Sequence, residues 1–131
     1  MLYVTRLFRT SITNMRSSLV SSFQDVKSAI KNENILVVDV REPEELKETG
    51  EIPGSINIPV GNLENVFKNL SNEQFKSTYG KNKPEYSTEI ILSCRSGKRS
   101  EMTQQILQKL GYCNVYNYSG GWLDWEKNQQ N

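Results

Sequence analysis

The stretch Cys94-Arg95-Ser96-Gly97-Lys98-Arg99 has residue types and a spacing that could do chemistry. It follows an apolar run, and three of the five residues after the cysteine are basic while none is acidic. Where a strand passes through a tight loop into a helix, backbone N–H groups point into the loop and the helix dipole adds positive potential. We therefore predict that the Cys94 thiol ionises readily and acts as a nucleophile.

The same loop could bind an anionic substrate beside the sulfur. Its backbone amides can donate to a charged atom, and its basic side chains offer two planar guanidinium forks and one ammonium point charge. Glycine within it allows a positive φ or a close approach. The predicted substrate-binding set is Arg95, Ser96, Gly97, Lys98 and Arg99. The alternatives are a solvated basic rim for the cations and an inert strand-end thiol for Cys94.

The elements that must position this loop follow from the apolar pattern. Apolar runs predict strands over residues 35–40, 56–58, 90–93 and 115–118. Capping residues and helical spacing predict helices after Ser22, over residues 43–47, around 63–70, after Ser71, over 101–110 and around Trp122 and Trp125. Alternating strands and helices predict an α/β fold with a mostly parallel sheet and helices on both faces.

In such folds the site lies beyond the carboxyl ends of the strands. Asp39, Cys94 and Tyr118 fall at three of these ends, so we expect them to converge. We predict that Asp39 pairs with Arg41 in a structural ion pair that orients the neighbouring loop.

Composition limits the function classes. The chain has 131 residues and a net charge of +1, which favours one domain and gives no argument for nucleic-acid binding. It has no apolar run of about eighteen residues, so no membrane helix is predicted. It has no histidine and no Cys-x-x-Cys, which excludes the usual zinc patterns and a Cys-His pair, and we expect neither metal nor cofactor. The second cysteine, Cys113, is predicted to be a bystander.

The N-terminal segment differs from the rest. Residues 1–20 contain Arg6, Arg9 and Arg16, many hydroxyl residues and no acid, which is typical of a mitochondrial transit segment. The alternative is an N-terminal tail that carries no targeting signal. Translation from Met15 would give a form without this segment, which we expect to be cytoplasmic. The folded domain is predicted over residues 21–128.

Four signatures in order carry a family resemblance. They are Asp39-Val40-Arg41-Glu42, the run from Gly50 to Pro59, the loop from Cys94 to Ser100, and Asn117-Tyr118-Ser119-Gly120-Gly121-Trp122. Together they resemble a rhodanese domain. The small size, the Gly-Lys-Arg of the loop and the Leu110-Gly111-Tyr112 that follows resemble the single-domain thiosulfate sulfurtransferases that use glutathione.

The resemblance implies a rhodanese-like, five-stranded parallel sheet and a catalytic Cys94 that becomes a persulfide. It implies thiosulfate as donor and glutathione, another small thiol or cyanide as acceptor, with thioredoxin as a further candidate acceptor. We expect a monomer or weak homodimer. The family often has histidine where this chain has Glu51, which could alter the approach of an anionic substrate.

Two other functions stay open at this point. Cysteine phosphatases and arsenate reductases also hold a cysteine in an anion-binding loop, but their loop is usually Cys-x5-Arg, whereas Arg99 closes a Cys-x4-Arg loop here. No acid lies in the loop to protonate a leaving alcohol. A rhodanese-like binding module without catalysis is the second alternative, although such modules often lack the cysteine.

Overall fold

In the computed structural model, which describes residues 19–129, the chain forms a five-stranded sheet in the order β1-β5-β4-β2-β3. The strands are β1 (Val20–Ser21), β2 (Ile35–Asp39), β3 (Ile56–Asn57), β4 (Glu89–Ser93) and β5 (Val115–Tyr118). The helices are α2 (Phe23–Ala29), α3 (Pro43–Thr49), α4 (Val60–Asn69), α5 (Asn72–Tyr79), α6 (Lys98–Lys109) and α7 (Gly121–Gln129). Every strand pairing is parallel, which confirms the predicted fold class.

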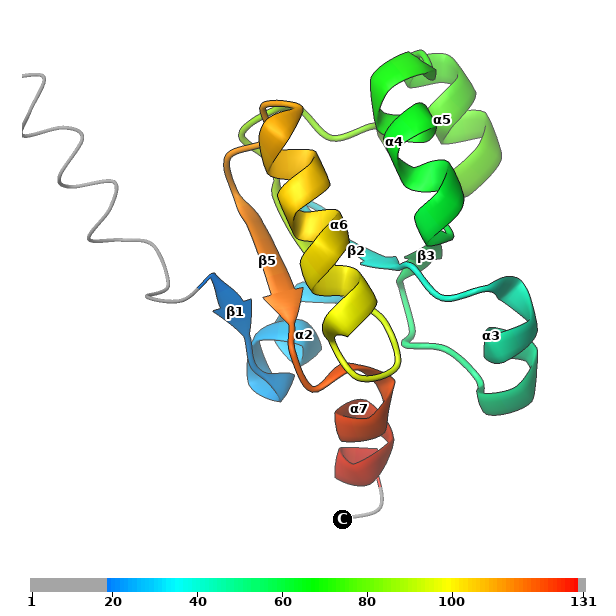
Figure 1. Ribbon diagram of the computed structural model, residues 1–131, viewed down its shortest axis with the longest axis vertical. Helices are drawn as coiled ribbons and strands as arrows, with labels where there is room; N and C mark the ends of the chain where they lie inside the picture. The colour runs from blue at the N-terminus through cyan, green and yellow to red at the C-terminus, as the bar shows by residue number, and fades with distance from the viewer. Residues whose placement is uncertain (1–18, 130–131) are drawn as a thin grey trace, which may run out of the picture.

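Helices cover both faces of the sheet (Figure 1). In the central strand β4, Ile90 and Leu92 point to one face and join a core formed with α4, α5 and α6. Ile91 points to the other face and joins a second core formed with α2 and α7. This alternation explains why the strand is apolar throughout, since both of its faces are covered.

The edge strand β1 was not predicted from the apolar pattern. It pairs Val20 with Asn117 and Ser21 with Tyr118 of β5. A two-residue strand has no periodicity to detect, and the number of five strands came only from the family resemblance. The strand begins at the last residue of the predicted transit segment, most of which lies outside the described residues.

The helix ends agree with the capping signals, with two differences. Ser22 and Asp25 form a reciprocal capping box at α2, and Ser71 caps α5. Helix α3 runs two residues past the predicted end at residue 47 and is closed by Gly50, whose φ is +94°. No helix within residues 19–129 is long and apolar enough to cross a membrane.

The other difference concerns α6, which begins at Lys98 and not at the predicted residue 101. Gly97, with a φ of +93°, precedes it, and its carbonyl accepts from the N–H of Glu101 at 3.1 Å. Two loop cations are therefore the first residues of the helix. Positive side chains oppose the helix dipole at that end, so local helix stability does not explain their presence there.

Candidate active site

Cys94 lies directly beyond the carboxyl end of β4, in the turn that leads into α6. The residue is buried, with 1 % of its surface exposed. Its Sγ accepts hydrogen bonds from the backbone N–H of Gly97 at 3.0 Å and from the N–H and the Oγ–H of Ser100 at 3.4 and 3.3 Å. The sulfur therefore sits among donors at the start of a helix, as the sequence predicted.

These donors decide the charge of the sulfur. Burial raises the pKa of the Cys94 thiol, because a charged sulfur loses its hydration. Hydrogen bonds from the Ser100 hydroxyl and from the amides of Ser100, Gly97 and Ser96 favour the thiolate and outweigh burial, so the net pKa lies below that of an ordinary cysteine. The thiolate is the nucleophilic form of cysteine.

The shape of the loop depends on close main-chain contacts with α7. The N–H of Trp122 donates to the carbonyl of Cys94 at 2.8 Å, and the N–H of Leu123 donates to the carbonyl of Arg95 at 3.2 Å. A Cβ on Gly121 would lie 2.5 Å from the Cys94 carbonyl oxygen. A Cβ on Gly97 would collide with the carbonyl of Ser119, and the positive φ of Gly97 also favours glycine.

Two residues outside the predicted set complete the surroundings of the sulfur. The Ser100 hydroxyl donates to Oδ1 of Asn117 at 2.6 Å, so its single proton is shared between this oxygen and the Cys94 sulfur, and Nδ2 of Asn117 donates to the carbonyl of Gly97 at 3.1 Å. Asn117 thus ties the helix start to β5 and orients the hydroxyl that faces the sulfur. The sequence did hold a signal for Asn117, because it is a polar residue between two tyrosines in a predicted strand.

Tyr118, which was expected to converge with Cys94, does not. Its side chain points to the opposite face of the sheet, where it is buried with α2 and α7, and its hydroxyl donates to Asp124 at 2.6 Å. Burial and the Asp124 carboxylate raise its pKa strongly. Because adjacent strand residues face opposite sides, the neighbouring Asn117 is the one that faces the site.

The expected pair of Asp39 and Arg41 is present and buried, with Nη2 and Oδ2 2.7 Å apart. The guanidinium also donates to Oγ1 of Thr49 at 2.9 Å and to the carbonyl of Gly50 at 3.2 Å. The guanidinium carbon Cζ of Arg41 lies 5.1 Å from the ring centre of Trp122. The pair therefore ties the end of α3 to the sheet and to α7, which agrees with a structural role.

Arg99 is held by an acid that the sequence reading did not consider. Its two terminal nitrogens donate to the two carboxylate oxygens of Glu45 in α3, at 2.7 and 2.9 Å. Hydrogen bonds from Arg99 are the main reason that the pKa of Glu45 falls to about 2, against a smaller effect of burial. The other members of the predicted substrate-binding set with side chains are exposed: Arg95 and Ser96 on the loop and Lys98 at the start of α6.

Cys113 is far from this site in the fold. It precedes β5, at the amino edge of the sheet, and its Sγ contacts the carbonyl of Tyr86 at 3.3 Å. Both cysteines are free, and Cys113 is exposed. Over the described residues, no group of three or more His, Cys, Asp or Glu side chains is placed to hold a metal ion.

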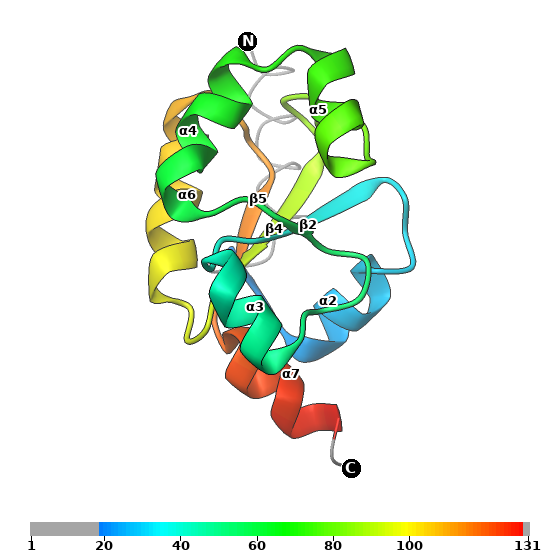
Figure 2. The ribbon, with the colours of Figure 1, turned by 90° about the vertical axis from the view of Figure 1, so that its right-hand side faces the viewer.

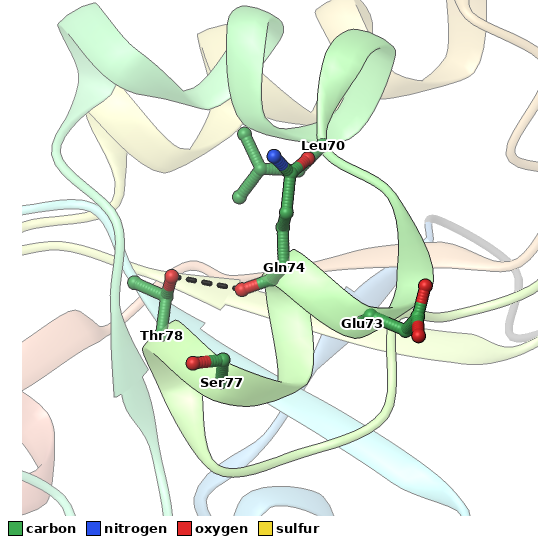
Figure 3. Close-up of a pocket in the computed structure, with 5 residues that line it drawn as sticks. All are labelled: Leu70, Glu73, Gln74, Ser77 and Thr78. Atoms are coloured by element: carbon green, nitrogen blue, oxygen red, sulfur yellow. Dashed lines mark hydrogen bonds between the residues drawn. The ribbon is translucent and has the colours of Figure 1, made fainter.

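Two hollows elsewhere on the surface do not include the Cys94 loop. The smaller one, of about 440 Å³, lies along α5 and is lined by Leu70, Glu73, Gln74, Ser77 and Thr78 (Figure 3). The dashed line there is a helix-internal bond from the Thr78 hydroxyl to the carbonyl of Gln74, at 2.8 Å. A larger hollow of about 1150 Å³ lies at the amino ends of β2 and β4. Neither hollow is lined by a cysteine, so we place the candidate site at Cys94.

Known proteins are similar to this chain in sequence and in fold. A relative from Schizosaccharomyces pombe, provisionally named a mitochondrial thiosulfate sulfurtransferase, is 41 % identical over 128 residues, 95 % of this chain and 88 % of the relative. The human thiosulfate:glutathione sulfurtransferase is 32 % identical over 105 residues, 79 % of this chain and 90 % of that protein. The solved structure of the human single-domain sulfurtransferase TSTD1 has a TM-score of 0.74 and 31 % identity, covering 82 % of this chain and 95 % of that one.

A model of the family described as the rhodanese-like domain matches residues 22–128. That match spans every element from α2 to the body of α7 and includes the Cys94 loop. The chain therefore belongs to the rhodanese-like domain family, as a sulfurtransferase.

Proposed function

We propose that Cys94 takes the outer sulfur of thiosulfate and passes it to a small thiol, with glutathione as the principal acceptor. The observation that carries this proposal is the set of hydrogen bonds from Gly97 and Ser100 that converge on the Cys94 sulfur. Such donors stabilise negative charge both on the attacking thiolate and on the persulfide that replaces it.

The reaction has two displacements. The Cys94 thiolate attacks the outer sulfur of thiosulfate, and the sulfur–sulfur bond breaks with its electron pair leaving on sulfite. The enzyme then carries Cys94–S–S⁻, so the charge at the site stays at minus one. The glutathione thiolate attacks the outer sulfur of this persulfide, which regenerates the Cys94 thiolate and releases glutathione persulfide.

The basic side chains of the loop support the choice of substrates. Arg95 and Lys98 are exposed beside the buried sulfur, where they can meet the sulfonate of thiosulfate and later the carboxylates of glutathione. The human relative named a thiosulfate:glutathione sulfurtransferase supports the same pair. Cyanide and thioredoxin are further acceptors to test beside glutathione, and we retain the expectation of a monomer or weak homodimer.

For the place of action, we propose mitochondria. The arginines and hydroxyl residues of residues 1–20 support a transit segment there, with residues 21–128 as the folded domain, and a form starting at Met15 would be cytoplasmic. The S. pombe relative, named mitochondrial, supports the same location.

Mass spectrometry of the intact protein tests the persulfide directly. After thiosulfate alone, we expect a gain of about 32 Da on Cys94, since one sulfur is bound covalently. With glutathione added, initial rates should give parallel lines in double-reciprocal plots, as a double displacement requires. Cys94→Ser should lose both signals and Cys113→Ser should keep both. An unchanged mass together with hydrolysis of an aryl phosphate would mean that the phosphatase alternative is correct.

A further inference from the structure

Arg99 is the loop cation whose guanidinium already forms an ion pair with a carboxylate. It is the second residue of α6, between the two residues whose amides donate to the Cys94 sulfur. Both terminal nitrogens of its guanidinium are occupied by the Glu45 carboxylate in a parallel two-bond arrangement. The Arg99 charge also interacts with the Cys94 sulfur, so an anion approaching that sulfur meets an arginine that already has a carboxylate partner.

The partner comes from a helix that lies on the surface. Helix α3 buries none of its residues, and it lies beside the turn into α6 (Figure 2). The side chains of Arg99 and Glu45 are 36 % and 31 % exposed, so water can replace either partner. Ion pairs with this exposure are weak, because solvent screens them and long side chains lose conformational freedom when they are fixed.

We propose that Glu45 is a specificity-determining residue: it occupies Arg99 in the free enzyme and competes with the anionic sulfur donor for that guanidinium. The proposal rests on the proposed function, since it needs an anionic donor at Cys94. A dianion such as thiosulfate must displace the Glu45 carboxylate from Arg99 against the repulsion between the two anions. A donor with one negative charge is repelled less by this carboxylate. Glu45 thus weakens donor binding and lowers the preference for doubly charged donors.

A purely supporting role for Glu45 predicts the opposite sign. If the carboxylate only held Arg99 in a productive position, its removal would loosen the guanidinium and raise the KM for the donor. If it competes, its removal frees the guanidinium and lowers that KM. The direction of the change therefore separates the two roles.

The test is Glu45→Gln, which keeps the side-chain size and removes the charge. We expect the KM for thiosulfate to fall about two- to fivefold, the range set by an exposed ion pair, with kcat changed less than twofold. The KM for an alkyl thiosulfonate, a donor with one negative charge, should fall less. The rate of the first half-reaction, followed as persulfide formation by mass spectrometry, should rise in the same proportion at low thiosulfate.

Two further variants provide controls. Glu44→Gln removes the same charge from the adjacent, exposed position of α3 and should leave the donor KM within its error. In an Arg99→Ala background, Glu45→Gln should have no further effect on the donor KM, because the guanidinium for which it competes is gone.

The outcomes distinguish this proposal from the function on which it rests. If wild-type protein forms no persulfide with thiosulfate, the proposed function fails. If wild type forms it but Glu45→Gln raises the donor KM, leaves it unchanged, or matches Glu44→Gln, competition for Arg99 is wrong while the function stands. An equal fall for the singly and doubly charged donors would also overturn the role in charge preference.

Discussion

The loop around Cys94 and the helix α3 lie side by side beyond the carboxyl ends of the strands, yet they are held by different kinds of contact (Figure 2). The loop is held by main-chain bonds from the start of α7 and by glycines that let the chains meet closely. Helix α3 buries no side chain and is held by polar bonds to Arg41 at its end and to Arg99 along its side.

This difference assigns the stabilisation of the charged sulfur to the loop and the adjustment of the site entrance to α3. Donors that stabilise a charged sulfur work best when they are already in place, and buried main-chain contacts achieve that. Helix α3 has no buried side chain and its pair with Arg99 is part-exposed, so we expect the helix to open at a lower free-energy cost than the loop. The sulfur is therefore held rigidly while its neighbour at the entrance can adjust.

The largest expected effect comes from breaking the buried tie at the base of α3. Asp39→Ala leaves the Arg41 guanidinium buried without its carboxylate, and we expect a loss of about 3–5 kcal/mol in the free energy of unfolding. Equilibrium unfolding in urea measures it. Glu45→Ala breaks the half-exposed pair with Arg99 and the bond from the Glu42 N–H that caps the same helix, and should cost about 1–2 kcal/mol. Equal losses would show that burial does not separate the two ties.

Next in size is a change to the rigid loop itself. Gly97→Ala introduces a methyl group that collides with the Ser119 carbonyl and requires a positive φ, so the amides around the sulfur must move. We expect kcat/KM for thiosulfate to fall by about 10²-fold, the usual cost of a small displacement of catalytic groups. Gly61→Ala is the matched control, because no atom lies within 4 Å of its added Cβ. Full activity of Gly97→Ala would refute the rigid-loop account.

The smallest effect is expected from one donor alone. Ser100→Ala removes the hydroxyl bond to the Cys94 sulfur and should raise the pKa of the thiol, because that bond favours the thiolate. At a pH below the pKa, alkylation by iodoacetamide should slow by about two- to tenfold, up to the equivalent of one charge-assisted hydrogen bond, because the hydroxyl shares its proton with Asn117. The midpoint of alkylation rate against pH measures the shift, and Cys113→Ser should not move the Cys94 midpoint. A midpoint that stays in place in Ser100→Ala would contradict the assigned donor.

The features that could be predicted from the sequence are those formed by residues close together in the chain. The Cys94 loop is contiguous, so its donors and charges could be read together, and the Asp39–Arg41 pair is two residues apart. Four strands and the caps at Ser22 and Ser71 carry local signals of periodicity and hydroxyl placement, and the structure agrees with them.

Contacts between distant segments could not be read in this way. The bond between Arg99 and Glu45 joins residues 54 apart, and either side chain alone looks like a solvated charge. The choice between Asn117 and Tyr118 depends on which face of β5 meets α6, and both residues are buried, so the burial pattern does not decide it. The two-residue strand β1 is defined only by its pairing with β5.

The way the backbone shapes the Cys94 loop has a consequence for divergence among related enzymes. Because carbonyls and amides define that shape, the exposed side chains at Arg95, Ser96 and Lys98 contribute little to it. Mutations at these three positions can accumulate without disturbing the hydrogen bonds that hold the sulfur. A lineage could therefore exchange one sulfur donor or acceptor for another through surface changes alone, while inheriting the same nucleophile unchanged.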